Sequence, residues 1–411
     1  MVVQSEPDTD HLVAAIYRSA ERGQEIEVWV TSYPTPQMLD RLKHIEEFEN
    51  VSVVSRFISS SSLKFIDRIL RLRYCRPVLV RRLSRRNFSL IVLEWGDGIQ
   101  ESRHSLLKTI RTFWIGQFSI QLQHAARHLG IPVVALPHGH SLKQSSIGSR
   151  HAQEVALQND GFLPFQNRDS FAAYVVAHES DRRFLTDLTT MSGLNIKVWG
   201  SARFSPQWIA RLYSRDSRRN SSKVNNSRTK VLFFLPKWNN SINRRETIGL
   251  LYKLASIPEL KLWIREHPRQ GSSSLEDDER SKLATNDSVV FFSRDVDSIR
   301  LIEQCDVLIE IESSIAIDAV FLGKRVIMPR YLQAPDVQSR FDSSKCVLRS
   351  NSCQETIDFV SQIGEPIKAD EYFCKEIAAQ LVDDELGFYD SNLKDIERSI
   401  NRPDGGFSAF G

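Results

Sequence analysis

The sequence predicts an α/β protein with two Rossmann-like domains that face each other across a cleft. The first observation is that short β-branched runs alternate with segments of helical periodicity along the chain. The second is that a polar stretch, residues 213–229, interrupts this alternation, with Val224 as its one apolar residue between the ends. A length of 411 residues also leaves room for two domains of about 200 residues each. We therefore expect an amino-terminal domain at 1–212, a linker at 213–229, a carboxyl-terminal domain at 230–390 and a tail at 391–411.

Each expected element follows from its residue pattern, because buried parallel strands are continuous apolar runs and helices repeat apolar residues every three or four positions. In the first domain the pattern predicts strands at 25–31, 51–55, 89–94, 132–136, 171–177 and 196–199, with helices at 9–22, 36–47, within 106–129 and near 181–191. In the second it predicts strands at 231–235, 260–265, 288–292, 307–311 and 325–328, with helices at 245–255, 275–283, 315–322, 354–363 and 369–381. Gly323 is expected to end the 315–322 helix in a left-handed conformation.

Polar residues follow the strand at 307–311, where the sequence reads Glu312-Ser313-Ser314. This turn places two hydroxyls and the free N–H groups of a helix amino terminus at the carboxyl end of a strand, where open α/β sheets bind anionic ligands. A phosphate group is therefore the expected ligand. The alternative is that Ser313 only caps the helix, as serine does at many helix starts without any ligand.

Side chains that can carry positive charge follow two other strands of the second domain. His267, Pro268 and Arg269 follow the strand at 260–265, and Lys237 follows the strand at 231–235. Because the carboxyl ends of parallel strands meet at one edge of their sheet, we expect these side chains to share an edge with the serine turn. The second domain is thus expected to bind a donor that carries phosphate.

The first domain offers candidates for a general base at two strand ends. His138 and Gly139 follow the strand at 132–136, and imidazole titrates near neutral pH while glycine lets a substrate approach the backbone. Glu94 and Asp97 lie beside two glycines at the end of another strand, so either carboxylate is an alternative base. A turn histidine with ordinary hydrogen bonds is the other interpretation of His138.

Taken together, these motifs resemble the two-lobed GT-B glycosyltransferase superfamily, and most closely its bacterial branch that uses cytidine-activated donors. His138-Gly139 looks like the turn of CDP-glycerol glycerophosphotransferases whose histidine acts as the base. His267-Pro268 and Ser313-Ser314 look like the pairs by which those enzymes, bacterial sialyltransferases and some Kdo transferases hold the phosphate and cytidine of the donor. The resemblance covers residues 89–330 and implies an acceptor in the first lobe and a donor in the second.

Two further segments are interpreted through this resemblance. Residues 94–98 depart from the acidic-acidic-glycine motif of sialyltransferases, because a Trp-Gly pair separates the two acids. Arg203 follows a glycine turn at a position that leads toward the hinge in GT-B proteins, so it either contacts the donor or caps local carbonyl groups.

The composition excludes several classes of protein. Hydrophobic and charged fractions of 41% and 26% are those of an ordinary soluble protein. The first residues lack the pattern of a secretory signal, and no apolar run approaches the roughly 20 residues of a membrane-spanning helix. The five cysteines form no CxxC pair and are expected to be reduced. The DxD at 295–297 precedes an expected helix, where aspartate is an ordinary cap, so we expect neither a metal nor another cofactor.

Positive charge is concentrated in residues 64–86, which carry nine Lys or Arg against one acid in a chain of net charge +3. Apolar residues alternate with this charge, which favours an anionic membrane surface as a partner, since each basic residue near such a surface contributes about 1 kcal/mol. The alternative is the solvated basic face of one helix. Nucleic acid is not an expected partner, because the segment lacks aromatic residues at stacking intervals.

The hypothesis from the sequence is a transferase that moves a glycosyl or glycerophosphoryl group from a nucleotide-activated donor, expected to be cytidine-linked. The acceptor is expected to be a surface polysaccharide or a lipid-linked carbohydrate, and the protein to be cytoplasmic and peripheral on the inner face of the membrane. One alternative is an isomerase that resembles UDP-sugar 2-epimerases. The other is a non-catalytic scaffold that binds nucleotide sugars in a polysaccharide assembly complex.

Overall fold

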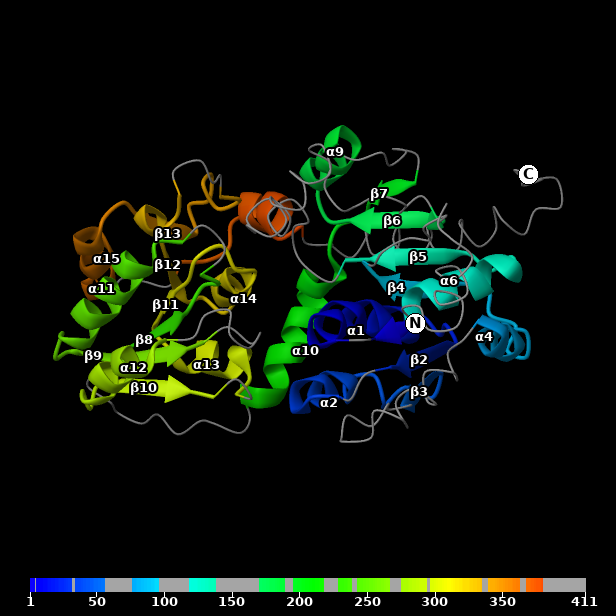
Figure 1. Cartoon of the computed structure of the whole chain (residues 1–411), viewed down its shortest axis with the longest axis horizontal. Helices are drawn as coiled ribbons and strands as arrows, with labels where there is room; N and C mark the ends of the chain where they lie inside the picture. The colour runs from blue at the N-terminus through cyan, green and yellow to red at the C-terminus, as the bar shows by residue number, and fades with distance from the viewer. Residues whose placement is uncertain are drawn as a thin grey trace, which may run out of the picture. The chain divides into compact units, whose positions relative to one another are not determined.

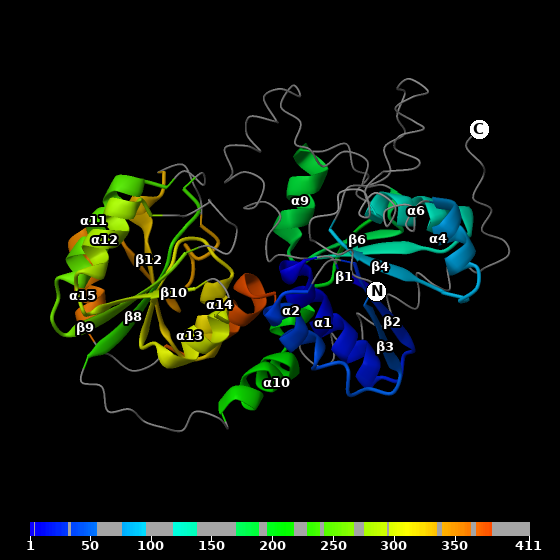
Figure 2. The ribbon, with the colours of Figure 1, turned by 60° about the horizontal axis from the view of Figure 1, so that its bottom comes forward.

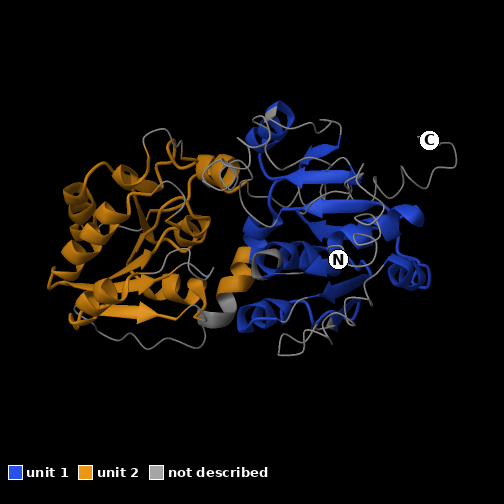
Figure 3. Ribbon diagram, in the orientation of Figure 1, with its two compact units in different colours: residues 1–143, 156–208, 380–411 blue, residues 144–155, 209–379 orange. Residues whose placement is uncertain are grey.

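The computed structural model describes residues 1–3, 5–31, 34–55, 76–95, 118–137, 170–188, 195–217, 228–238, 242–266, 275–293, 296–334, 339–362 and 367–379. These residues form two compact units, which Figure 3 colours separately. Unit 1 holds the described residues up to Trp208, and unit 2 holds those from Ile209 to Ala379. Each unit is built from parallel strands with helices packed against them (Figure 1), which confirms the predicted α/β class with two Rossmann-like bodies.

The strands of unit 1 form two sheets in which all neighbours are parallel. One sheet has the order β1-β2-β3, and the other has the order β4-β5-β6-β7. Strand β1 also packs beside β4 (Figure 2), so the strands follow the order 3-2-1-4-5-6-7 of a doubly wound fold. Their bounds are β1 (Val2–Val3), β2 (Ile26–Val30), β3 (Val51–Ser55), β4 (Ile91–Glu94), β5 (Val133–Leu136), β6 (Ala173–Val176) and β7 (Ile196–Val198).

The helices of unit 1 begin at recognisable sequence signals. In α2, the Thr35 side chain accepts a hydrogen bond from the Met38 N–H, and Pro36 occupies the first turn, where its missing N–H costs nothing. Helix α10 begins in unit 1, where Trp208 is buried against Tyr17. The helical bounds are α1 (Glu6–Glu21), α2 (Pro36–Leu42), α4 (Arg76–Leu83), α6 (Phe118–His128), α9 (Glu179–Leu188), the 3₁₀ turn η2 (Ala202–Phe204) and α10 (Pro206–Ser217).

Unit 2 contains one sheet of parallel strands in the order β10-β9-β8-β11-β12-β13. Numbered within the unit this is 3-2-1-4-5-6, the Rossmann order, and the direction of winding reverses between β8 and β11. Ligands of such sheets bind outside the carboxyl ends of the strands at this switch point. The bounds are β8 (Thr229–Phe234), β9 (Leu260–Arg265), β10 (Val289–Phe292), β11 (Val307–Ile309), β12 (Arg325–Pro329) and β13 (Val347–Ser350).

Side-chain caps mark the starts of α11 and α13 in unit 2. Asn243 accepts from the Glu246 N–H at the start of α11, and Asp297 accepts from the Ile299 N–H at the start of α13, as predicted for this aspartate. The helical bounds are α11 (Arg244–Ala255), α12 (Asp277–Ala284), α13 (Ser298–Gln304), α14 (Ile315–Phe321), α15 (Cys353–Ser361), the 3₁₀ turn η3 (Arg330–Leu332) and the π-helix η4 (Phe373–Ile377). Across the part of the chain that the structure describes, no helix combines the length and apolar character needed to cross a bilayer.

The segment from β11 to β12 agrees closely with the sequence prediction. Gly323 has φ of +67° directly after α14, and β12 follows at Arg325. Elements that were not predicted include β1, α10 and β13. The expected linker at 213–229 begins inside α10, because a polar helix surface and a polar linker have the same composition.

Candidate functional site

The carboxyl ends of β8 and β11 lie next to each other at the switch point of the unit 2 sheet. The two strands pair in parallel, with Phe233 opposite Ile309. Lys237 follows β8 and is half-buried. Next to it, Trp238 is half-buried beneath the guanidinium of Arg244, which lies 5.6 Å from the ring centroid. A cation and an aromatic ring thus follow β8, whose carboxyl end lies at the edge where a Rossmann sheet binds ligands.

The exit of β11 is a tight turn organised by Glu310. This side chain is fully buried, and one of its oxygens accepts a hydrogen bond of 2.5 Å from the Ser313 N–H. The other oxygen, Oε1, makes no hydrogen bond to any residue that the structure describes. Burial raises the pKa of Glu310 from 4.5 to about 8, although the Ser313 N–H opposes this shift. The raised pKa favours the neutral form of this carboxyl group, which is bonded to the serine turn through the Ser313 N–H.

The two serines are placed as the sequence predicted at the end of a strand and the start of a helix. Ser314 is the N-cap of α14 but makes no side-chain cap hydrogen bond, and the Ser313 Oγ accepts from the Ile315 N–H at 3.4 Å. Both side chains are half-buried. One of the N–H groups expected to face a phosphate, that of Ser313, is instead bonded to Glu310. The turn therefore offers hydroxyl groups more than backbone N–H groups to a ligand.

Glu312 holds this turn in an unusual backbone conformation. Its φ is +57°, in the left-handed region that residues other than glycine rarely adopt. The carboxylate interacts with Ser339 and Arg340, and burial raises its pKa while the charge of Arg340 opposes the shift. Strained residues persist where the surrounding structure fixes them, and they cluster at binding sites. The geometry of Glu312 thus supports the assignment of this turn to a ligand site.

Strand β9 contributes a buried cation next to the switch point. Arg265, its last residue, is 1% exposed and lies opposite Phe234 of β8. Its guanidinium lies 5.5 Å from the centroid of the Phe234 ring and donates to the Ser298 hydroxyl at the start of α13. The candidate residues His267, Pro268 and Arg269 come next in the sequence and lie outside the described residues. Arg265 was assigned only to a strand from the sequence.

The candidate bases of the first domain lie at or just after the ends of β4 and β5. These strands are neighbours, and Glu94 is opposite Leu136 in their register. The next residue, Trp95, is a core residue that donates from Nε1 to the Val175 carbonyl at 2.6 Å and stacks on Tyr174. Asp97, His138 and Gly139 lie outside the described residues. Glu94 alone of these candidates is seen, half-buried at the carboxyl end of its strand.

Arg203 forms an ion pair within unit 1. It is 2% exposed, and its Nε lies 2.7 Å from Oδ2 of Asp10 on α1. Arg41 of α2 approaches the other oxygen of the same carboxylate at 3.1 Å. Burial alone would raise the pKa of Asp10, but the two guanidinium groups hold it well below its usual range. These contacts join η2 to α1 and α2, which is a structural role for Arg203.

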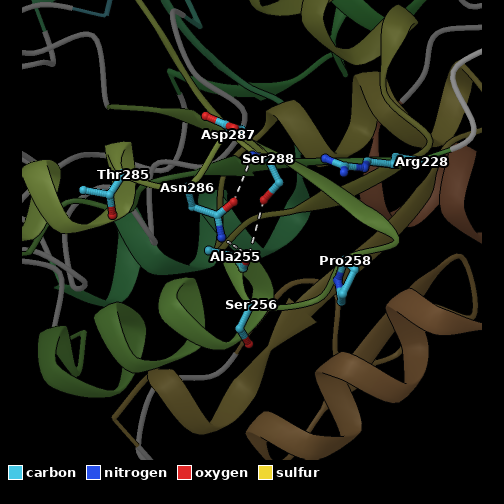
Figure 4. Close-up of a pocket in the computed structure, with 8 residues that line it drawn as sticks. All are labelled: Arg228, Ala255, Ser256, Pro258, Thr285, Asn286, Asp287 and Ser288. Atoms are coloured by element: carbon cyan, nitrogen blue, oxygen red, sulfur yellow. Dashed lines mark hydrogen bonds between the residues drawn. The ribbon is translucent and has the colours of Figure 1, made fainter.

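A hollow of about 540 Å³ lies at the opposite, amino edge of the unit 2 sheet (Figure 4). Asn286 and Ser288 extend into it, but both side chains donate to the Ala255 carbonyl at the end of α11. These bonds satisfy a carbonyl that the helix leaves unpaired. The lining of this hollow thus closes a helix end and includes none of the candidate site residues.

Sequence reasoning missed Glu310, which was treated as part of an apolar strand. The available signal was a lone acid inside the run Val307 to Ile311, because a carboxyl group among buried apolar residues needs a specific reason. Within the described residues, no group of three or more His, Cys, Asp or Glu side chains is arranged to hold a metal ion.

Comparison with known proteins gives matches in structure alone. No protein-family model matches the sequence, and no curated protein matches it. UDP-GlcNAc 2-epimerase from Neisseria meningitidis, solved with UDP-GlcNAc, has a TM-score of 0.54 at 13% identity and covers 96% of this chain and 98% of its own. UDP-N-acetylglucosamine 2-epimerase from Rickettsia bellii has a TM-score of 0.55 at 14% identity, with coverage of 98% and 97%.

A glycosyltransferase from Rickettsia africae is similar over the same extent, with a TM-score of 0.51, 10% identity and coverage of 98% of each chain. At such identities the likeness establishes the fold and leaves the activity open. The chain therefore has a GT-B-like fold of two Rossmann-like units, a fold found in both nucleotide-sugar epimerases and glycosyltransferases.

Proposed function

We propose that the chain is an enzyme of the GT-B type that binds a nucleotide-activated sugar in unit 2 and transfers its glycosyl group. The observation that carries this proposal is the switch point between β8 and β11. Lys237 follows one of these strands, and the turn from Glu310 to Ser314 follows the other. Rossmann sheets bind nucleotides at this place, and the fold is shared with UDP-GlcNAc 2-epimerases and a glycosyltransferase.

The chemistry of the exits fits a donor whose leaving group is a nucleotide phosphate. Negative charge develops on the phosphate as the glycosyl bond breaks, and a fixed cation stabilises it. Lys237 is the proposed cation, and Ser313 and Ser314 are proposed to donate hydroxyl hydrogen bonds to the phosphate oxygens. His267 and Arg269, which follow β9, are proposed to join this set. A neutral Glu310 carboxyl adds no negative charge below the phosphate at pH 7.

The remaining groups are assigned on the sequence motifs. His138 is proposed to accept the proton of the acceptor hydroxyl, with Asp97 and Glu94 as the alternatives. The acceptor is proposed to be a carbohydrate or a lipid-linked carbohydrate. The histidine and serine motifs favour a cytidine donor, whereas the similar structures include an enzyme bound to UDP-GlcNAc.

A second candidate function is epimerisation of a UDP-sugar at C2. It is favoured by the similarity over nearly the whole chain to UDP-GlcNAc 2-epimerases from two organisms. An epimerase inverts one carbon and leaves the sugar attached to the nucleotide at equilibrium. A transferase releases the nucleotide and needs an acceptor to do so efficiently.

Product analysis by NMR separates these two functions. The purified protein is incubated with UDP-GlcNAc and, separately, with CMP- and CDP-linked donors, each with and without a mixture of carbohydrate acceptors. The proposal predicts nucleotide release that increases when acceptor is added, with no new C2 epimer. Formation of an epimer without acceptor would replace the transferase by the epimerase, and no conversion of any donor would refute both.

A further inference from the structure

Helices α4 and α6 pack against each other on unit 1 (Figure 2). Leu79 and Leu83 of α4 are buried in the same apolar core as Leu122 and Ala125 of α6. Both helices therefore have one fixed face against the unit and present the other face outward. A partner that binds unit 1 at these two helices would therefore contact their outward face.

This outward face is basic. In the described stretches 76–95 and 118–137 the one acidic residue is Glu94, at the end of β4, while α4 and the turn after it carry five arginines, at 76, 81, 82, 85 and 86. Arg127 and His128, at the end of α6, are exposed. Arg76 and Arg127 both lower the pKa of His124, secondary to the effect of its burial, so these charges from the two helices lie close together. Of the arginines after α4, Arg86 pairs with Glu27 of β2 at 3.4 Å.

The exposed side of α4 is also partly apolar. Pro77 is exposed, Val78 is 43% exposed, and Arg81 lies one turn further along the same side of the helix. Arg85 follows in the turn after the helix and is exposed as well. An aliphatic side chain open to water beside two arginines matches the composition of a surface that enters the headgroup region of a bilayer.

We propose that the face formed by α4, the turn after it and the end of α6 docks unit 1 on an anionic lipid bilayer. Arg81 and Arg85 supply attraction to the headgroups, and Val78 enters the interface between headgroups and acyl chains. A soluble polyanion such as RNA fits this face less well. Single-stranded nucleic acid needs aromatic rings for stacking, whereas the exposed apolar residue of this face, Val78, is aliphatic. The face is distinct from the strand ends proposed to bind the nucleotide.

The test is co-sedimentation of the full chain with phosphatidylcholine vesicles that do or do not contain phosphatidylglycerol. Binding is expected only with phosphatidylglycerol and is expected to weaken as salt is added, because the attraction is screened. Loss of both charges in Arg81→Gln/Arg85→Gln is expected to lower the partition coefficient about 25-fold, at about fivefold for each charge. The matched control is Lys253→Gln/Lys345→Gln, which removes two exposed charges from unit 2 and is expected to bind like the unmodified chain.

Val78→Ser separates a membrane from a soluble polyanion. It is expected to weaken vesicle binding severalfold and to leave binding to a polyuridine RNA unchanged, since only the bilayer accepts an apolar side chain. Circular dichroism of each variant checks that the fold is retained. Equal binding to both kinds of vesicle would overturn the proposal, as would an Arg81→Gln/Arg85→Gln variant that binds normally. Tighter binding to RNA than to vesicles, insensitive to Val78→Ser, would assign the face to a polyanion instead.

Discussion

Replacement of His138 by alanine is expected to lower the turnover number by a factor of about 10² to 10⁴ and to leave nucleotide affinity nearly unchanged. This is the usual cost of removing a general base. An imidazole with a pKa near 6.5 is sufficiently unprotonated at pH 7 to accept a hydroxyl proton, whereas a carboxylate with a reference value near 3.9 is a weak base unless burial raises its pKa. Initial rates under saturating donor measure the first effect, and calorimetric titration with nucleotide measures the second.

Asp97→Asn and Glu94→Gln are the matched comparisons for this prediction. Glu94 ends β4 directly opposite Leu136, the last residue of β5, and His138 follows only two residues later. All three candidates therefore belong to two neighbouring strand ends. If Asp97→Asn or Glu94→Gln is the inactive variant while His138→Ala retains most of its activity, the assignment of the base moves to that carboxylate.

Glu310→Gln is expected to make the protein progressively more stable than the unmodified chain as pH rises. The pKa of Glu310 is about 8 in the folded protein and about 4.5 when the chain is unfolded. Between these values the folded state holds a proton that the unfolded state has released, so the free energy of unfolding falls by about 1.4 kcal/mol for each pH unit. Below about pH 4.5 Glu310 is protonated in both states, so the free energy of unfolding does not change with pH on its account. The stability that protonated Glu310 contributes is lost as pH rises from there through about 8.

A glutamine removes this dependence because it stays neutral, while its oxygen still accepts from the Ser313 N–H. Urea unfolding of both proteins is compared at intervals between about pH 5 and about pH 8, where the difference in free energy is expected to grow to about 4 kcal/mol at most. Glu312 and Arg340 also act on Glu310, with opposing effects on its pKa, and both residues are retained in the variant. Glu259→Gln, at an exposed position, is the control and is expected to show a constant difference. A Glu310→Gln difference that does not change with pH would show that Glu310 is ionised throughout.

The strands of unit 2 were predictable from sequence because a strand buried on both faces is a continuous apolar run. β9 was predicted at its observed bounds, and β11, α14 and β12 within two residues of theirs. β13 was missed because its residues, Val347 to Ser350, include an exposed arginine that breaks the run. Helix α10 was missed for a different reason, since its buried residues, Trp208 and Leu212, lie in a segment whose other residues are mostly polar.

The location of the candidate site residues in the fold was predictable as far as it depends on strand ends. Ser313 and Lys237 were identified because each follows a strand, and the topology then brings those two strands together. Glu310 was not identified, because its importance comes from the burial of a carboxyl group and its bond to Ser313, which depend on the packed sheet. Arg203, by contrast, was a candidate from the sequence because it is a charged residue after a glycine turn. In the structure it forms an ion pair with Asp10 on α1, which is distant in sequence.

The claim that unit 2 binds a nucleotide at its switch point is tested most directly by thermal unfolding with CMP, CDP, UDP and GDP. A ligand at about 100 times its Kd adds about 2.7 kcal/mol, which corresponds to a rise in Tm of about 5 to 10 °C. This rise is expected for a cytidine or a uridine nucleotide, and it is expected to be lost in Lys237→Ala/Ser313→Ala/Ser314→Ala. The same rise is expected to persist in Lys253→Ala/Ser256→Ala, which alters exposed residues at the end of α11. Absence of a shift with any nucleotide, or an equal shift in the Lys237→Ala/Ser313→Ala/Ser314→Ala variant, would show that no nucleotide binds at the switch point of unit 2.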